Sequence, residues 1–246
     1  MFCLRDVTVR YPSTTALAQV SLSMGPGEVV GLVGPSGAGK TTLLRTLNGG
    51  IRPTSGQVEV DGEALSTRTE SQLRALRSRI GFVAQTHDLV PTLRVSQNVL
   101  LGRIGQMGWL RSAATLLWPS RSTLEEAHQR LVQVGIGDKI FQRTDTLSGG
   151  EQQRVAIARA LHQEPVALLA DEPVASVDPA RGREVLDLLT RLAEERGACL
   201  VVSLHDLALA RTLPRLIGLR DGQVVFDAPT PTLGDDDFIQ LFGHPP

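Results

Sequence analysis

Alternating and apolar segments divide the first third of the chain into strand-length elements. Alternation of apolar and polar residues over 2–9 predicts a strand, and a second strand is predicted near 19–24. Residues 57–62 predict a strand that enters a tight Asp-Gly hairpin. These segments together predict an antiparallel β layer beside the main core.

Uninterrupted apolar runs predict a second, parallel sheet. Residues 28–33, 165–170 and 199–203 are apolar runs of strand length. The last two follow helix-like stretches at 149–162 and 179–196, respectively. Alternation of strands with helices predicts parallel strands whose carboxyl ends meet at one edge of the sheet.

The pattern of the sequence changes from strand-like to helix-like between residues 90 and 146. Helix-like segments separated by glycines occupy this stretch, with Trp109, Trp118 and Pro119 in its middle. We expect a helical lobe here, inserted into a core formed by roughly 1–89 and 147–246. The predicted fold class is therefore α/β, as a single domain over 1–246.

Composition and charge exclude several kinds of protein. With 246 residues and 41% hydrophobic content, the chain can bury a sizeable core. A net charge of −1 gives no general attraction to nucleic acid, and we expect no such partner. Arg74, Arg77 and Arg79 could form a local basic stripe, but a solvated helix face is favoured.

Cysteine usage and hydropathy indicate a reduced, intracellular chain. Cys3 and Cys199 are too few and too far apart for a disulfide framework, and no metal-ligand spacing appears. No apolar run approaches the roughly 20 residues that span a bilayer, and the first residues are no secretion signal. If the protein serves transport, another chain must form the channel.

Residues 34–41 read Gly-Pro-Ser-Gly-Ala-Gly-Lys-Thr, which predicts a loop that cradles phosphate. The glycines permit a close backbone approach to phosphate oxygens, and a helix predicted at 40–48 directs its free N–H groups at the same place. Lys40 can bridge the β and γ phosphates, and the Thr41 hydroxyl can hold Mg²⁺. The expected phosphate-binding residues are Gly34, Pro35, Ser36, Gly37, Ala38, Gly39, Lys40, Thr41 and Thr42.

Acidic and basic side chains follow two of the predicted parallel strands. Asp171 and Glu172 end one apolar run, and His205 follows the next. Ligand-binding residues gather at the carboxyl ends of parallel strands, so these three and Lys40 should converge. A solvated strand end would also carry two acids, but the phosphate loop upstream favours a catalytic pair.

A second motif identifies the kind of nucleotide hydrolase. Residues 147–154 read Leu-Ser-Gly-Gly-Glu-Gln-Gln-Arg, which together with the phosphate loop resembles the ATP-binding cassette (ABC) family. That family couples ATP hydrolysis to the assembly and opening of a two-subunit machine, most often one that moves a solute across a membrane. The resemblance implies a P-loop core of mostly parallel sheet, an antiparallel β layer and an inserted helical lobe.

The resemblance also implies roles for single residues. Asp171 matches the position that holds Mg²⁺, directly or through water, and Glu172 the position that polarises the attacking water. His205 resembles the switch histidine that contacts the γ-phosphate. Gln85 matches the glutamine that touches Mg²⁺ and senses the membrane partner, although a glutamine alone carries almost no information. Tyr11 matches the aromatic residue that stacks on adenine; an ordinary strand-end aromatic is nearly as good an interpretation.

The signature segment predicts a second phosphate-facing helix end. Ser148 is a plausible N-cap, and the amides of Gly149 and Gly150 begin a helix whose positive end could hold an anion. In the family this end faces the ATP of a partner subunit, and Asp178 matches a loop that crosses that interface. Glu151 stands where many members have Gln.

Other features look like the ATP-binding subunits of phosphonate importers. These features are residues 170–178, the Ser-Leu-His step at 203–205 and the tryptophan-bearing insert at 108–119. The resemblance implies ATP and Mg²⁺ as cofactors, and a second cassette subunit, most simply an identical one. It also implies a permease, a periplasmic or lipid-anchored solute-binding protein, and a peripheral position on the cytoplasmic face of the inner membrane.

Alternatives to phosphonate import stay open at this point. Phosphite, phosphate esters, phosphate or another small solute would suit the same motifs, because no residue here touches the solute. A soluble cassette ATPase of DNA repair or translation would usually carry paired cassettes, a coiled-coil insert or a basic face. A small-molecule P-loop kinase would need a substrate lid in place of the signature.

Overall fold

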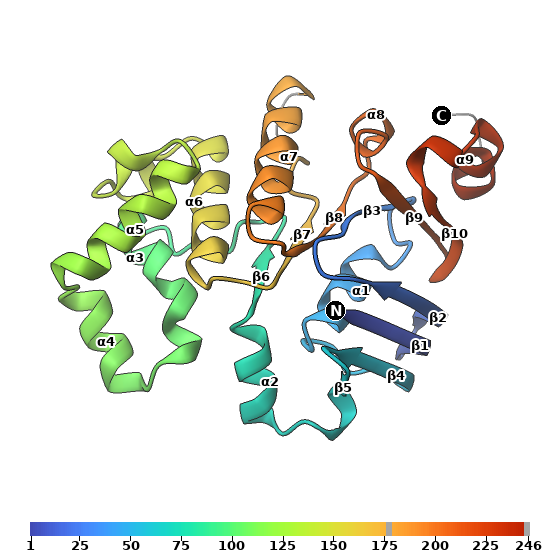
Figure 1. Ribbon diagram of the computed structural model, residues 1–246, viewed down its shortest axis with the longest axis horizontal. Helices are drawn as coiled ribbons and strands as arrows, with labels where there is room; N and C mark the ends of the chain where they lie inside the picture. Colours follow the sequence, from blue (N-terminus) through green and yellow to red (C-terminus); the bar gives the residue numbers. More distant parts are fainter. Residues whose placement is uncertain (176–178, 244–246) are drawn as a thin grey trace.

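A computed structural model describes residues 1–175 and 179–243 of the chain. The fold combines a small antiparallel sheet, a larger mixed sheet and a group of helices at the left of Figure 1. The predicted α/β class is confirmed by this arrangement.

The antiparallel sheet has the strand order β2-β1-β4-β5. Its strands are β1 (Phe2–Tyr11), β2 (Thr14–Met24), β4 (Ser55–Val60) and β5 (Glu63–Ala64). Asp61 and Gly62 join β4 to β5 with φ of 54° and 78°, as a tight Asp-Gly hairpin requires. The predicted antiparallel layer is confirmed, and β1 and β2 are longer than predicted.

The larger sheet has the order β10-β9-β3-β8-β7-β6, and every pair except β10 with β9 is parallel. Its strands are β3 (Val29–Val33), β6 (Ile80–Val83), β7 (Ala167–Asp171), β8 (Cys199–Ser203), β9 (Arg215–Arg220) and β10 (Gln223–Pro229). All residues of β3, β7 and β8 are buried, which explains why these strands were visible in the sequence as uninterrupted apolar runs.

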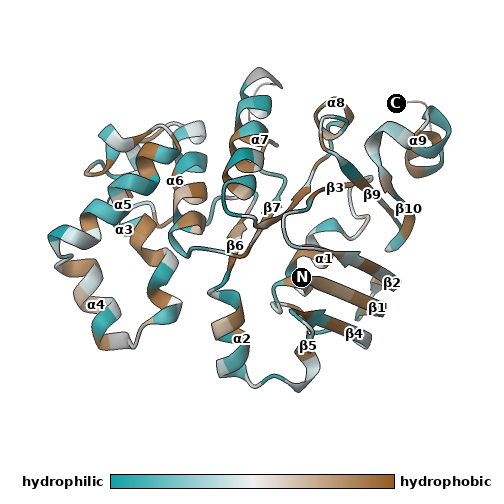
Figure 2. Ribbon diagram, viewed as in Figure 1, coloured by the Kyte–Doolittle hydropathy of each residue, from teal (hydrophilic) through white to brown (hydrophobic). Residues whose placement is uncertain are grey.

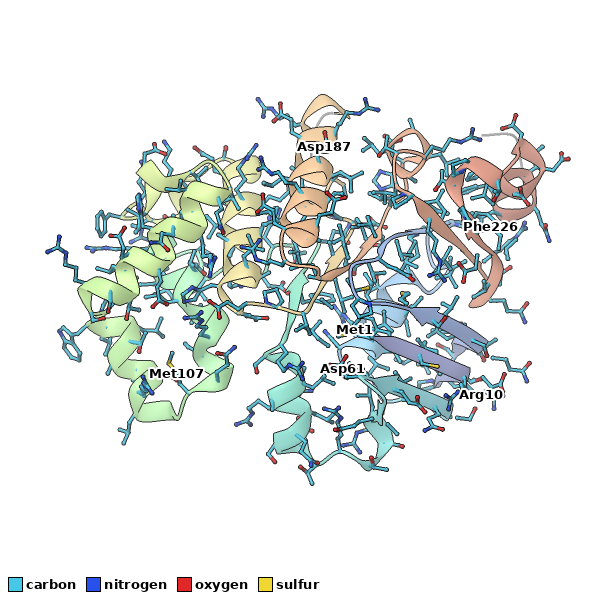
Figure 3. The ribbon with its side chains drawn as sticks, in the orientation of Figure 1. Met1, Arg10, Asp61, Met107, Asp187 and Phe226 are labelled. Atoms are coloured by element: carbon cyan, nitrogen blue, oxygen red, sulfur yellow. The ribbon has the colours of Figure 1, made fainter. Side chains whose placement is uncertain are left out.

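Helices connect the strands of the larger sheet and cover it. They are α1 (Lys40–Leu47), α2 (Glu70–Arg77), α6 (Gly149–His162), α7 (Pro179–Glu194), α8 (Leu207–Ala210) and α9 (Asp235–Phe242), with short 3-10 turns at η1 (Leu65–Thr67) and η5 (Thr230–Thr232). The ring of Phe226, labelled in Figure 3, packs edge to face against the ring of Phe238 with the centroids 5.7 Å apart, and so attaches α9 to β10. Three aspartates occupy the first turn of α9, where negative charge is favoured by the helix dipole.

The predicted helical region contains α3 (Val95–Leu100), η2 (Leu101–Gln106), α4 (Trp109–Leu117), α5 (Arg121–Gln133), η3 (Gly137–Lys139) and η4 (Thr144–Thr146). The signature helix α6 packs directly against α3 and α5. It therefore links this region to the sheet, whose neighbouring strand β7 follows it (Figure 1). The boundary between core and lobe near residue 147 stays a prediction.

Two hydrophobic clusters lie on opposite faces of the larger sheet. Val29, Val33 and Val202 belong to one cluster, and Val30 and Leu32 belong to the other. Successive side chains of a strand point to opposite faces, so one short strand contributes to both clusters. Figure 2 shows the central strands as predominantly hydrophobic. Within the described residues, no helix combines the length and apolarity needed to cross a bilayer.

His162 gives the fold a pH dependence. This side chain ends α6, is 2% exposed, and its Nδ1 has no hydrogen-bond partner among the described residues. Burial, together with the charges of Arg103 and Arg130 and against an opposing effect of Glu164, lowers the pKa of His162 to about 4.

Acidification should therefore destabilise the protein before its carboxylates titrate. Between pH 6.5 and 4, His162 is protonated in the unfolded chain but stays neutral in the folded chain. The free energy of unfolding should therefore fall by about 3 kcal/mol across this range. Urea titrations across this window measure the slope. His162→Leu should flatten it, whereas His128→Gln should not; equal slopes in wild type and His162→Leu would contradict the assignment.

Candidate functional site

The loop at 34–41 joins β3 to α1 and depends on glycine at both of its ends. Gly34 has φ of 150°, and a Cβ there would lie 2.0 Å from the Leu219 carbonyl oxygen. Gly39 has φ of 104°, and its Cβ would lie 2.4 Å from the Ala16 oxygen. Any other residue would strain the backbone and force the two chain segments apart. The loop therefore has the tight path that its sequence predicted.

Lys40 begins α1 and turns its side chain back into the loop. Its ammonium donates to the carbonyl oxygens of Gly34 at 2.7 Å and Pro35 at 3.1 Å, and its side chain is 6% exposed. Burial lowers the pKa of Lys40, while the negative charges of Glu172 and Asp171 act in the opposite direction. The ammonium is thus held at the inner side of the loop, where an anion would meet it.

A buried hydroxyl connects the ends of β7 and β8. Ser203 is fully buried; its Oγ donates to Asp171 Oδ1 at 2.8 Å and accepts from the Glu172 backbone N–H at 2.8 Å. The Thr41 hydroxyl donates to the same Asp171 oxygen at 3.1 Å. Sequence reasoning used Ser203 only as part of the Ser-Leu-His step at 203–205 and did not assign it to the site.

Glu172 stands at the centre of the polar groups beyond β7. Its Oε2 accepts from Gln85 Nε2 at 3.2 Å and lies 4.0 Å from His205 Nδ1, and its Oε1 lies 4.0 Å from Lys40 Nζ. The Glu172 backbone has φ of 46°, a left-handed conformation that costs energy outside glycine. The bond from its N–H to Ser203 holds this conformation, so the carboxylate is directed toward the loop.

A cleft of about 290 Å³ opens between these groups. Its lining consists of Ala16, Ser36, Gly37, Ala38, Gly39, Lys40, Thr41, Thr42, Gln85 and Glu172. The structure thus brings the phosphate loop together with Gln85 and Glu172, residues that lie more than 40 positions apart in the sequence. Ala16, in β2, was not expected in the lining; nothing in its residue type signalled it.

Tyr11 lies outside this lining. It ends β1, pairs with Thr14 across the hairpin to β2 and is 44% exposed. Its ring is therefore accessible beside the same hairpin that supplies Ala16, but the described cleft does not include it. Stacking of Tyr11 on a base stays a prediction.

Ser148 and Glu151 cap α6 reciprocally. The Glu151 backbone N–H donates to Ser148 Oγ at 3.4 Å, and the Glu151 carboxylate accepts from the Ser148 N–H at 2.9 Å. The Ser148 hydroxyl also donates to the Glu151 carboxylate at 2.9 Å, and Lys139 lies 3.7 Å from it. The predicted N-cap is confirmed. A Cβ on Gly149 or Gly150 would meet no atom within 4 Å, so this helix end is open.

The signature residues do not line the cleft of their own chain. Neither Ser148 nor the two glycines after it belongs to that lining. A single site formed by the cleft and by the signature residues would therefore need a second molecule that supplies one of the two. Asp178, predicted at the same interface, lies outside the described residues.

The residues at the loop suit a hard cation. Among the described residues, no group of three or more His, Cys, Asp or Glu side chains could hold a metal. Thr41 Oγ1 and Asp171 Oδ1 nevertheless meet at 3.1 Å, and oxygen donors of this kind, with waters and phosphate oxygens, complete a Mg²⁺ shell. The donor set therefore fits Mg²⁺ bound together with a phosphate ligand.

Comparison with known proteins identifies relatives over nearly the whole chain. The sequence profile of the ABC transporter family matches residues 17–175. The phosphonates import ATP-binding protein PhnC of Pseudomonas putida is 48% identical over 98% of this chain and 89% of its own length. PhnC 1 of Rhodopseudomonas palustris is 42% identical over 99% of this chain and 87% of its own length.

Solved structures give the same relationship. The dimeric structure of MJ0796, a bacterial ABC transporter cassette, has a TM-score of 0.83 at 34% identity and covers 94% of this chain and 99% of that one. The dimeric post-hydrolysis state of MJ0796 bound to ADP and Pi has a TM-score of 0.80 at 33% identity, with the same coverage. The architecture of the two sheets and the helical group is therefore shared with these cassettes.

Removing the Ser203 hydroxyl should destabilise the protein. Ser203→Ala would leave the part-buried Glu172 N–H without its partner at a strained φ, and we expect a loss of about 1–3 kcal/mol in the free energy of unfolding. Ser112→Ala is a matched control, because that hydroxyl, 7% exposed, donates only to the Gly108 carbonyl one turn earlier. Denaturant unfolding of both variants measures the difference; equal losses would show that Ser203 does not hold this backbone.

Proposed function

The chain belongs to the ABC transporter family, and we propose that it is the ATP-hydrolysing subunit of an importer whose solutes are phosphonates. The observation that carries the enzymatic part is the convergence of Glu172, Gln85 and Lys40 on the cleft beneath the phosphate loop. A carboxylate beside a cationic phosphate cradle is the arrangement that hydrolysis of a nucleoside triphosphate requires.

Binding of ATP would use the loop and the start of α1. The backbone N–H groups of residues 36–42 would donate hydrogen bonds to the phosphate oxygens, and the helix dipole adds positive potential at the same place. The Lys40 ammonium, held by two carbonyl oxygens, would bridge the β and γ phosphates. Tyr11, accessible beside the hairpin, would stack on adenine.

Hydrolysis would use the groups beyond β7 and β8. Glu172 would orient a water and accept its proton while the water oxygen bonds to the γ-phosphorus and the bond to the bridging oxygen breaks. His205, 4.0 Å from Glu172, would contact the γ-phosphate. ADP and inorganic phosphate are the products. Thr41, Asp171 and Gln85 would hold Mg²⁺, which supplies neutralisation of the phosphate charge.

Dimerisation would complete each site. The open helix end at Ser148, Gly149 and Gly150 would meet the ATP of the opposite cassette, with Glu151 fixing the cap and Asp178 at the interface. An identical second copy is the simplest partner. The dimeric state of the related MJ0796 cassette supports this arrangement. Nucleotide would hold the two cassettes together, and hydrolysis would release them.

Transport would require further chains. We propose an integral-membrane permease, a periplasmic or lipid-anchored solute-binding protein and a peripheral position at the cytoplasmic face of the inner membrane. The relatives' designation as phosphonate import proteins, at 48% and 42% identity, supports this assembly and solute class. Phosphite, phosphate or another small solute is the alternative, since the receptor and the permease select the solute.

Glu172→Gln tests the catalytic assignment. The amide keeps the size of the side chain but accepts no proton, so turnover should fall by about 10²–10⁴-fold while ATP binding is retained. The variant should accumulate an ATP-bound dimer, measurable by size-exclusion chromatography. Lys40→Ala should instead weaken ATP binding, because it removes the cation that faces the phosphates.

The matched control is Glu125→Gln, which changes an exposed carboxylate on α5 in the same way. It should hydrolyse ATP at the wild-type rate. Normal turnover in Glu172→Gln would contradict the role of Glu172, and unchanged ATP affinity and turnover in Lys40→Ala would contradict the phosphate site.

Retention of membrane proteins by the tagged chain tests the transport assignment. Mild-detergent extracts of native membranes should yield a multi-span protein together with a solute receptor, both identified by mass spectrometry. The receptor can then be titrated with phosphonate, phosphite and phosphate to fix the solute class. Retention of soluble proteins alone, with no membrane partner, would overturn the importer assignment and leave the ATPase assignment intact.

A further inference from the structure

The outer face of α4 is apolar but exposed. Leu110, Ala113, Ala114 and Leu117 follow the i, i+3, i+4, i+7 spacing of one helix face, and all four are exposed. Leu110 is 67% exposed, Leu117 is 62% exposed, and Trp118 directly after the helix is 80% exposed. We call these five residues the α4 stripe. In an ordinary surface helix, such a stripe faces the core.

The opposite face of α4 is already packed. Ser112 is buried, Leu116 contacts the larger hydrophobic cluster, and the Leu116 carbonyl accepts from Gln97 Nε2 of α3 at 3.1 Å. Thr115 lies 3.9 Å from the sulfur of Met107, which precedes the helix (Figure 3). The helix is therefore anchored with its apolar stripe outward, at the left end of the molecule and away from the small sheet (Figure 1).

The segment of the chain that carries the stripe has charges of one sign only. Residues 89–124 contain four arginines and no aspartate or glutamate. Arg103 is paired with Glu126 and Glu164. Arg111, in the first turn of α4, and Arg121, the first residue of α5, are exposed and have no ion-pair partner in the described part of the chain. An exposed apolar stripe flanked by unpaired arginines is the pattern of a helix that lies at an anionic lipid surface.

We propose that the α4 stripe docks on the anionic headgroup region of the cytoplasmic membrane leaflet. Trp118 would sit at the headgroup level that tryptophan prefers, Leu110 and Leu117 would enter the acyl boundary, and Arg111 and Arg121 would meet lipid phosphates. A basic loop of a membrane protein suits this face poorly, since cytoplasmic loops carry an excess of Lys and Arg and would repel it. The proposal rests on the proposed function, which places the chain at this leaflet.

Binding to protein-free vesicles tests the proposal. Vesicles of phosphatidylethanolamine and phosphatidylglycerol should co-sediment the wild-type protein, and vesicles of phosphatidylcholine should retain much less. Leu117→Gln combined with Trp118→Gln should reduce the partition coefficient by about tenfold or more. Arg111→Gln combined with Arg121→Gln should produce a similar loss that disappears at high salt, where the wild type has already lost this electrostatic attraction.

Ile239→Gln is the matched control. Ile239 is a partly exposed apolar residue, 38% exposed, on α9 and belongs to no such stripe, so this variant should bind vesicles like the wild type. Absence of wild-type binding, or equal binding by the Leu117/Trp118 variant, would overturn the proposal. Loss of a co-purifying membrane protein in that variant, with no vesicle binding by the wild type, would identify a protein partner instead and overturn it too.

ATP turnover in solution separates this inference from the function on which it rests. All α4 variants lie outside the nucleotide cleft and should hydrolyse ATP within about twofold of the wild-type rate, as surface substitutions usually leave distant sites unchanged. Normal turnover without vesicle binding would refute only the lipid contact. Absence of turnover in the wild type would refute the proposed function, whatever the vesicles show.

Discussion

The parallel pairing of β3, β8 and β7 is the constraint on which the rest of the structure depends. Ser203 in β8 pairs with Leu32 in β3 and with Asp171 in β7, so three distant segments end at the same edge of the sheet. The phosphate loop leaves β3 at this edge, and Glu172 follows β7 there. The groups proposed for catalysis are therefore positioned by the backbone hydrogen bonds of the apolar strands that precede them.

Two opposing electrostatic effects act on Lys40 at this edge of the sheet. Burial penalises the ammonium of Lys40, while the carboxylates of Asp171 and Glu172 favour it. The Ser203 hydroxyl donates a hydrogen bond to Asp171 and accepts one from the Glu172 backbone N–H. The second bond keeps Glu172 in its strained left-handed conformation. A site preorganised in this way stabilises phosphate charge without rearrangement of its own dipoles.

The helical group provides two outward surfaces with different physical character. The first is the capped start of α6, an open and polar helix end that suits an anionic ligand held by another subunit. The second is the α4 stripe, which is apolar and flanked by arginines. Because α6 packs against α3, and α3 holds α4 through Gln97, both surfaces belong to one connected group of helices.

The sequence by itself determined the loop at 34–41, the α6 helix with its Ser148 cap and the buried strands that lie in the apolar runs at 28–33, 165–170 and 199–203, because each depends on residues close together in the chain. It did not show β9 and β10, the Ser203 bridge, the left-handed backbone of Glu172, or Ala16 in the cleft. The Ser203 hydroxyl and Asp171 are 32 positions apart, and only the register of the sheet brings them within 2.8 Å. The sequence also shows the two tryptophans of the insert, but only tertiary packing decides which face of α4 is exposed to solvent. Local patterns are encoded by neighbours in the chain, whereas such contacts depend on how distant elements pack.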